Sequence, residues 1–279
     1  MEVTWYPAPA KLNLFLHVLG RRKEGEHAGY HDLQTVFRLV DLADRVGIAP
    51  REDGEVRFSG VFGEDNLCSK AARLLKSRSG TKQGCDLRLE KALPIGGGLG
   101  GGSSDAATVL VVLNRLWESD LPTAELMDMG LALGADVPFF VLGENAVGEG
   151  VGERLQPLAL PPAWYLVLAP QVSVSTKEIF ASGALTRDTK RLKIPPFFSG
   201  QGRNDLEPVV TARYPEVAAH LAWLRSRVPG ARMTGSGACV FAEFGSEAEA
   251  RQVLRQLPQG MSGFVARGLE RHPLREMGF

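Results

Sequence analysis

Six glycines within seven consecutive positions form the segment of this sequence that is best suited to chemistry. The segment comprises Pro94, Ile95, Gly96, Gly97, Gly98, Leu99, Gly100, Gly101, Gly102, Ser103 and Ser104. Because glycine has no Cβ atom, this backbone can adopt positive φ angles and let a bulky anion approach its N–H groups closely. A strand pattern precedes it at residues 85–91, and an apolar helical face follows it. The helix N-terminus would add free N–H groups and a positive dipole, which together favour phosphate.

Three other interpretations of the glycine segment have to be weighed. A flexible surface turn would not be followed at once by a strong helix start. A Walker A loop ends in Gly-Lys-Ser or Gly-Lys-Thr, and this segment does not. Gly96, Gly98 and Gly101 match G-x-G-x-x-G, but a dinucleotide fold needs a second apolar strand ending in an acid about 20 residues later. Residues 117–122 lead into another helix instead, which excludes a nicotinamide oxidoreductase.

A lysine and an asparagine near the N-terminus could bring a cation and an amide to one site. Residues 11–18 alternate with period two, so Lys11 and Asn13 would emerge on the same face of a strand. Pro7 and Pro9 would interrupt the strand before this run, because proline gives no N–H to a ladder. A lysine near a strand start is more often a solvated edge charge, and the spacing leaves both interpretations open.

Asp136 lies between a helix end expected at Gly134 and the apolar segment 137–142. A carboxylate in such surroundings usually needs a partner or a chemical role. Val137 precedes Pro138 and is therefore expected to be extended, which would fix how Asp136 projects.

Tyr30 and His31 open the strand expected over residues 30–40. Two interpretations fit them equally well, namely exposed residues beside a turn or a pair that stacks on a ligand. Asn66 directly precedes a predicted helix and is typical of an N-cap.

The elements that must position these residues divide into two groups. Strands are expected at residues 3–6, 11–18, 30–40, 44–50, 56–62, 85–91, 165–169 and 263–266. Helices are expected at residues 67–76, 106–117, 122–133, 205–212, 215–227 and 247–257. Residues 183–203 are polar and contain prolines, which predicts a long loop. A cluster of prolines after residue 156 places the domain boundary near residue 155, giving domains 1–155 and 156–279.

Composition limits the compartment and the partners. The 32 basic and 32 acidic residues cancel, so no general attraction to nucleic acid or to a membrane is expected. Cys68, Cys85 and Cys239 are odd in number and far apart, which is typical of reduced thiols in a cytoplasmic protein. We expect neither a signal peptide nor a membrane span, because no apolar run approaches 18 residues. We expect a monomer or a weak homodimer.

Three separated motifs resemble the signatures of the GHMP kinase superfamily, namely Pro9–Leu14, Pro94–Ser104 and Thr234–Gly237. Three further segments are similar to the branch of that superfamily that acts on a cytidine-diphosphate sugar alcohol, namely Gly29–Thr35, Glu64–Leu67 and Leu133–Pro138. The resemblance covers about residues 5–267. It implies an α+β fold of two domains, with an N-terminal α/β sandwich of mostly antiparallel strands and a ferredoxin-like C-terminal α+β domain.

The same resemblance implies an ATP-dependent small-molecule kinase and assigns roles at the nucleotide. The phosphates of ATP would lie under residues 94–104, and Asn66 and Leu67 would line the adenine pocket. Asp136 would be the catalytic base and Lys11 its partner beside the transferred phosphoryl group. Phosphoryl transfer depends mainly on positioning and on charge stabilisation, so a carboxylate that aligns the hydroxyl and takes its proton late is sufficient.

Roles at the second substrate also follow from the resemblance. Tyr30 and Phe180 would sandwich the cytosine, with His31 at its polar edge. Asn13 and Thr176 would lie near the sugar alcohol or the phosphates.

A magnesium ion would be held mostly by phosphates, water and Ser104. Asp105 is a further candidate, although it could equally supply a favourable charge in the first helical turn.

Two alternatives remain at this stage. One is a GHMP kinase of the mevalonate or homoserine type, against which Tyr30, His31 and Phe180 argue, since those substrates have no base to stack. The other is a ligand sensor without activity on the same fold, which would have no need of both Lys11 and Asp136.

Overall fold

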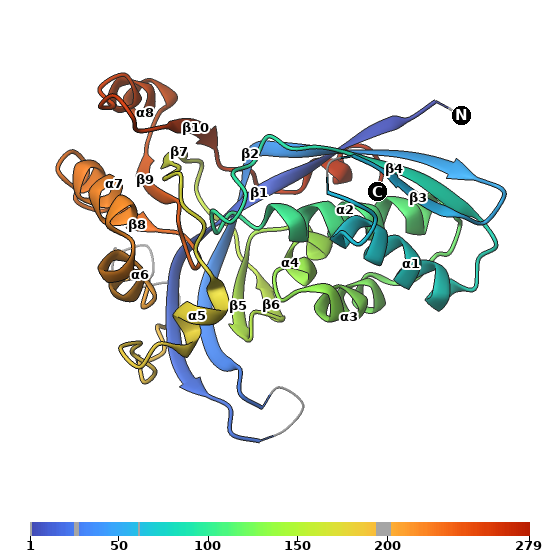
Figure 1. Ribbon diagram of the computed structural model, residues 1–279, viewed down its shortest axis with the longest axis horizontal. Helices are drawn as coiled ribbons and strands as arrows, with labels where there is room; N and C mark the ends of the chain where they lie inside the picture. The colour runs from blue at the N-terminus through green and yellow to red at the C-terminus, as the bar shows by residue number, and fades with distance from the viewer. Residues whose placement is uncertain (1, 25–27, 61, 194–201) are drawn as a thin grey trace.

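The computed structural model describes residues 2–24, 28–60, 62–193 and 202–279, which form two sheets with their helices (Figure 1). The first sheet has the order β3-β4-β2-β5-β6, with β1 paired to β2. Its strands are β1 (Thr4–Arg21), β2 (His31–Arg51), β3 (Val56–Ser59), β4 (Gly84–Glu90), β5 (Ala146–Gly150) and β6 (Arg154–Pro157). Among the strand pairs that the described residues form in this sheet, only β3 and β4 run parallel. The sequence expectation of a mostly antiparallel N-terminal sheet is therefore confirmed.

Four helices lie together on one side of this sheet in Figure 1. They are α1 (Leu67–Ser79), α2 (Gly101–Leu116), α3 (Thr123–Leu133) and α4 (Val137–Leu142). Val109, Leu110 and Leu113 of α2 are fully buried, and each such side chain contributes about 1.5–3 kcal/mol on burial. This packing holds in place the helix whose N-terminus begins in the glycine segment.

The second sheet has the antiparallel order β10-β7-β9-β8. Its strands are β7 (Trp164–Leu168), β8 (Arg232–Met233), β9 (Val240–Phe244) and β10 (Gly263–Arg267). The helices of this half are α5 (Thr176–Ala181), α6 (Glu207–Arg213), α7 (Pro215–Arg225) and α8 (Glu247–Leu254). The chain order strand, helices, two strands, helix and strand is ferredoxin-like, as expected. The domain boundary near residue 155 stays a prediction, and residues 194–201 of the predicted loop lie outside the described residues.

β1 and β2 form a long antiparallel ribbon, which corrects the expectation that prolines would interrupt β1. The register shifts between Pro9 and Ala10, and β1 pairs only with β2 in the described sheet. A proline is tolerated on such an edge strand or at a bulge, because its missing N–H has no partner to lose. The two strands expected at residues 30–40 and 44–50 are likewise joined in β2.

A second register shift, between Asn13 and Leu16, decides which side chains reach the site. Lys11 and Asn13 lie on a common face, and the Lys11 ammonium donates a hydrogen bond to the Asn13 side chain. Beyond Asn13 the strict alternation breaks, since Leu14 and Phe15 pack in the same buried cluster. The bulge therefore separates the polar pair from the apolar part of the strand.

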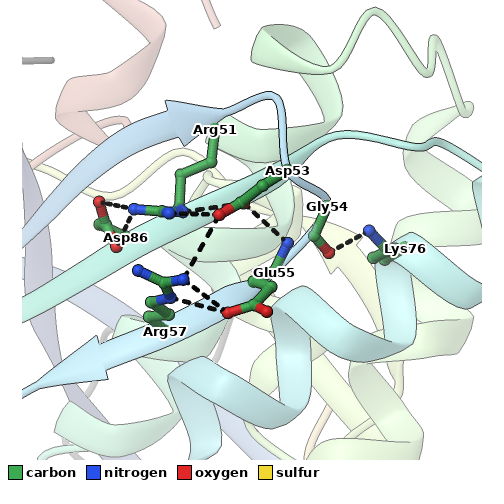
Figure 2. Close-up of polar contacts among 7 residues, drawn as sticks. All are labelled: Arg51, Asp53, Gly54, Glu55, Arg57, Lys76 and Asp86. Atoms are coloured by element: carbon green, nitrogen blue, oxygen red, sulfur yellow. Dashed lines mark hydrogen bonds and ion pairs between the residues drawn. The ribbon is translucent and has the colours of Figure 1, made fainter.

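The turn between β2 and β3 is held by a polar network at the far end of the first sheet (Figure 2). Arg51 donates to Asp53 and, at 2.9 Å, to Asp86 of β4. Lys76 of α1 donates to the carbonyl oxygen of Gly54, so the network joins three elements. The Arg51 guanidinium holds the pKa of Asp53 well below its usual range. Exposed ion pairs of this kind contribute little each, so their main effect is to fix the geometry of the turn.

The last residues of the chain return to the first domain through His272. Its backbone N–H donates to Gly143 at 2.8 Å, and its Nδ1 accepts from Leu274 N–H at 3.1 Å, while Nε2 is buried without a partner. Burial, reinforced by Arg275, lowers the pKa of His272 to about 3.

Within the residues described, no helix has the length and apolar character needed to span a bilayer.

We expect His272 to make the protein acid-sensitive. The folded pKa lies below the unfolded value of 6.5, so the unfolded state binds the proton more readily and stability falls as the pH drops through this window. Between pH 7 and pH 5 this one group should cost about 2 kcal/mol. His272→Asn keeps an acceptor for Leu274 N–H and cannot titrate, so urea unfolding at both pH values should show a smaller loss. An equal loss in both proteins would contradict the assignment.

Candidate active site

A buried lysine and a carboxylate from distant parts of the chain meet at the centre of the molecule. Lys11 Nζ lies 3.3 Å from Asp136 Oδ2, and the two side chains are 3% and 33% exposed. The ammonium also lies 5.7 Å from the centre of the Phe37 ring. The interpretation of Lys11 as a solvated edge charge is therefore wrong. The pair presents one buried cation beside one partly accessible carboxylate.

Asp136 immediately precedes α4, and this corrects the expected extended conformation of Val137. Val137 is the first residue of α4 and Pro138 the second. Proline is well tolerated in the first helical turn, where its missing N–H would have no intrahelical partner. The buried α4 thus fixes the position from which Asp136 projects toward Lys11.

The glycine segment follows a path that only residues without a side chain permit. The φ angles of Gly96, Gly98 and Gly100 are 70°, 75° and 74°. A Cβ atom on Gly98 would lie 2.5 Å from the carbonyl oxygen of Thr234, and Lys11 N–H donates to Leu99 at 2.9 Å. The segment is therefore held tightly between β1 and the turn at Thr234–Gly237 (the second glycine turn), which is not the behaviour of a flexible surface loop.

Two cavities lie on either side of the glycine segment. One has a volume of about 360 Å³ and the other of about 880 Å³. Gly96, Gly98, Gly100 and Ser103 line both. A long ligand could therefore lie in one cavity and extend across the glycine backbone to the other.

The structure distributes the predicted residues between these cavities. The smaller one is lined by Asn66, Leu67, Pro94, Ile95, Gly96, Gly97, Gly98, Leu99, Gly100, Gly101, Gly102 and Ser103. The larger one is lined by Lys11, Asn13, Tyr30, His31, Asp136, Thr176 and Phe180. Ser104 lines neither, and its fully buried Oγ has no hydrogen-bond partner. Asn66 and Leu67 thus lie only at the smaller cavity and the residues predicted for the second substrate only at the larger one, while Gly96, Gly98, Gly100 and Ser103 form the wall between them.

Asn66 has the structural role that its position suggested. Its Oδ1 accepts from Ser69 N–H at 3.0 Å and caps α1, and its Nδ2 donates to Gly63 at 2.6 Å. Both ends of the side-chain amide are therefore engaged. This arrangement orients the first turn of α1 toward the smaller cavity.

Asp105 is engaged by the partly buried Lys91 in the wall of the smaller cavity. Lys91 donates to Asp105 at 2.8 Å and also to Asp44. Burial raises the pKa of Asp105 to about 7, against the opposing effect of Lys91. Asp105 lies beyond the first turn of α2 and so does not supply the charge weighed for it there, whereas a role toward a metal ion stays a prediction. Among the residues described, no group of three His, Cys, Asp or Glu side chains could hold a metal ion.

At the far end of the larger cavity, aromatic rings from β2 and α5 meet. His31 stacks on Phe180 with a centroid distance of 5.1 Å and an interplanar angle of 29°. Tyr30 is 59% exposed at the cavity mouth. Burial, followed by the charges of Arg187 and Arg21, lowers the pKa of His31. This end of the cavity is suited to a planar group with a polar edge.

Several residues at the site were not among the sequence candidates. Arg21 and Lys177 line the larger cavity and add positive charge to that of Lys11. Thr234 accepts from Asn13 N–H at 2.9 Å, and Ser236 shares a hydrogen bond of 2.6 Å with Thr176. Gly235 and Gly237 beside them indicated a turn at these positions in the sequence. The two cations lie in segments whose sequence gives no such signal.

Comparison with known proteins agrees with this geometry. Residues 66–144 match the GHMP kinases N terminal domain and residues 182–263 match the GHMP kinases C terminal domain. The chain resembles a crystal structure of 4-(cytidine 5'-diphospho)-2C-methyl-D-erythritol kinase with a TM-score of 0.82, 35% identity and coverage of 95% of this chain and 99% of that one. Homoserine kinase from Cytophaga hutchinsonii, at 16% identity and a TM-score of 0.70 over 98% and 96% of the two chains, shares the fold. The class is therefore that of the GHMP kinases, which are ATP-dependent kinases of small molecules.

Relatives of higher sequence identity show to which family of GHMP kinases the chain belongs. The 4-diphosphocytidyl-2-C-methyl-D-erythritol kinase of Nitrosospira multiformis is 59% identical over 277 residues, covering 97% of this chain and 92% of the relative. The enzyme of that name from Thiobacillus denitrificans is 59% identical over 273 residues, covering 96% of each. The chain belongs to the 4-diphosphocytidyl-2-C-methyl-D-erythritol kinase family.

Proposed function

We propose that this chain transfers a phosphoryl group from ATP to the 2-hydroxyl of 4-diphosphocytidyl-2-C-methyl-D-erythritol, with Lys11 and Asp136 at the reacting atoms. The products would be the 2-phosphate and ADP, within the non-mevalonate route to isoprenoid precursors. One observation carries the proposal: the glycine segment separates two cavities, and the Lys11–Asp136 pair lies where it meets the larger one.

We assign the smaller cavity to the nucleotide. Asn66 and Leu67 line its far side, and residues 94–103 form the wall that it shares with the larger cavity. Gly96, Gly98 and Gly100 line both cavities, and a glycine segment at a helix start supplies backbone N–H donors. Such donors suit the phosphates of ATP and leave its terminal phosphoryl group beside Lys11.

We assign the larger cavity to the cytidyl substrate. Phe180, His31 and Tyr30 provide rings at the end where a base would stack. Lys11, Arg21 and Lys177 supply positive charge along the cavity, which complements a diphosphate. Mevalonate and homoserine have no base and no diphosphate, so this cavity argues against either as the substrate.

In the proposed reaction, Asp136 accepts a hydrogen bond from the acceptor hydroxyl and takes its proton as the new P–O bond forms. Lys11 stabilises the negative charge on the transferred phosphoryl oxygens. Asn13 keeps the ammonium in place through its side-chain oxygen, since its Nδ2 is fixed by Thr35 at 2.9 Å. Positioning and charge stabilisation together account for the chemistry.

For magnesium we propose Ser104 as the protein ligand, with phosphates and water supplying most of the coordination. The unpartnered Oγ of Ser104 supports this assignment, and Asp105, whose Oδ2 accepts from Lys91 and whose Oδ1 is unpartnered, is the alternative ligand. The ion would neutralise charge on the nucleotide phosphates.

We also propose that the chain acts in the cytoplasm, as a monomer or a weak homodimer. Three buried free cysteines suit a reducing compartment.

The decisive experiment is ATP consumption by the purified protein with three acceptors offered separately. Turnover with 4-diphosphocytidyl-2-C-methyl-D-erythritol, and not with mevalonate or homoserine, is the expected result. Phosphorus NMR of the product should show a new phosphomonoester. Preference for mevalonate or homoserine, or binding of ATP without turnover of any acceptor, would overturn the proposal.

Tyr30→Ala is expected to raise KM for the cytidyl substrate about tenfold, because stacking on one ring contributes about 1–3 kcal/mol. KM for ATP should stay unchanged, since Tyr30 lines only the larger cavity. Tyr30→Phe keeps the ring and should keep most of the affinity. Initial rates measured with each substrate varied in turn would check this, and an equal loss for both substrates would show that the cavity is wrongly assigned.

A further inference from the structure

Arg187 joins the two elements that meet at the aromatic end of the larger cavity. Its Nε donates to His31 Nε2 at 3.0 Å. Its terminal nitrogens donate to three backbone oxygens after and within α5, those of Phe180 at 2.9 Å, Ser182 at 2.7 Å and Leu185 at 3.1 Å. Within the described part of the chain no carboxylate forms an ion pair with it. The guanidinium is thus used to hold structure together rather than to balance a charge.

The bond to His31 determines where the imidazole carries its proton. A guanidinium can only donate, so Nε2 of His31 must be the acceptor and the proton must be on Nδ1. Among the described residues Nδ1 has no hydrogen-bond partner, yet it is absent from the buried unsatisfied atoms. Because His31 lines the larger cavity, the Nδ1–H donor is open to a ligand there.

Arg187 also fixes how the rings of His31 and Phe180 are arranged. His31 begins β2 and Phe180 lies in α5, so nothing in the local chain keeps their rings parallel. Arg187 bonds to the ring of one and to the backbone of the other. It lines neither cavity itself, so any effect on a ligand passes through these two residues.

We propose that Arg187 is a positioning residue for the base of the cytidyl substrate: it holds the His31–Phe180 stack and keeps the His31 proton on Nδ1, facing the cavity. This inference rests on the proposed function for the identity of the ligand. A neutral imidazole with a fixed Nδ1–H can donate to a ring nitrogen or carbonyl of a base, and cytosine offers both on one edge. A ring free to exchange tautomers would present that donor only part of the time.

The first test needs no substrate. Nitrogen NMR of the protein labelled in histidine should show the His31 Nδ1–H form in the wild type and a loss of that form in Arg187→Met. Arg187→Lys keeps a donor near Nε2 and should keep the Nδ1–H form. Arg191→Met, a change of the same type at an exposed arginine paired with Glu149, should leave the His31 signals unchanged. Unchanged signals in Arg187→Met would overturn the proposal.

The second test is kinetic. Arg187→Met should raise KM for the cytidyl substrate by up to about tenfold, the effect of losing one hydrogen bond between neutral groups at the base. KM for ATP and kcat at saturation should change little. A general folding defect would instead lower the fraction of active enzyme, and with it the apparent kcat, and leave both KM values as they are. An unchanged KM for the cytidyl substrate would overturn the proposal. If the wild type fails to turn over that substrate, the proposed function falls, while the His31 spectrum still decides the role of Arg187.

Discussion

Asp136→Asn is expected to lower kcat by roughly 10²–10⁴-fold, the range associated with a positioned general base. Asparagine has nearly the same shape and can still hold the acceptor hydroxyl, but it cannot take the proton. It also removes the negative charge that lies 3.3 Å from Lys11 Nζ. The ammonium would then be less well balanced, so KM for ATP should stay the same or fall.

The measurement is ADP release at saturating concentrations of both substrates, together with calorimetric binding of each. Asp128→Asn is a matched control, since it makes the same change at an exposed position on α3. The control should keep wild-type kcat. A kcat for Asp136→Asn close to that of the wild type would remove Asp136 from the mechanism.

Gly98→Ala is expected to disturb the nucleotide site more than any other single methyl group added to the glycine segment. The φ angle of 75° alone costs an L-residue about 1–2 kcal/mol. The new methyl would lie 2.5 Å from the carbonyl oxygen of Thr234, which is backbone and cannot swing aside. Either the segment or the second glycine turn must move, so we expect KM for ATP to rise at least about tenfold.

Gly80→Ala separates the effect of backbone strain from that of the steric clash. Gly80 has a φ of 71° at the end of α1, but a Cβ atom there would meet nothing within 4 Å. This control should lose stability through its backbone alone, by about 1–2 kcal/mol, and keep its KM for ATP. Thermal unfolding and ATP kinetics of both variants give the comparison. If Gly98→Ala had a wild-type KM for ATP, the close approach to Thr234 would have no bearing on nucleotide binding.

Local patterns in the sequence were sufficient to predict the place of a side chain wherever a single strand or helix fixes it. Period-two alternation placed Lys11 and Asn13 on one face, and the position of Asn66 identified it as a cap. Those predictions hold because they depend on neighbouring residues, whose geometry is fixed by the element itself. Predictions failed where tertiary context overrode a local preference, as at Val137, which α4 takes into its first turn.

The sequence by itself determined that the glycine segment leads into a helix, and it located most of the longer helices and strands, although not α4, β5 or β6. Only the tertiary structure decided that Asp136 meets Lys11, that the glycine segment separates two cavities, and that Arg187 reaches His31. Propensity and periodicity act over a few residues, whereas these contacts depend on how whole helices and strands pack against one another. A side chain in a loop, such as Arg187, has no periodic neighbours from which its partner could be read.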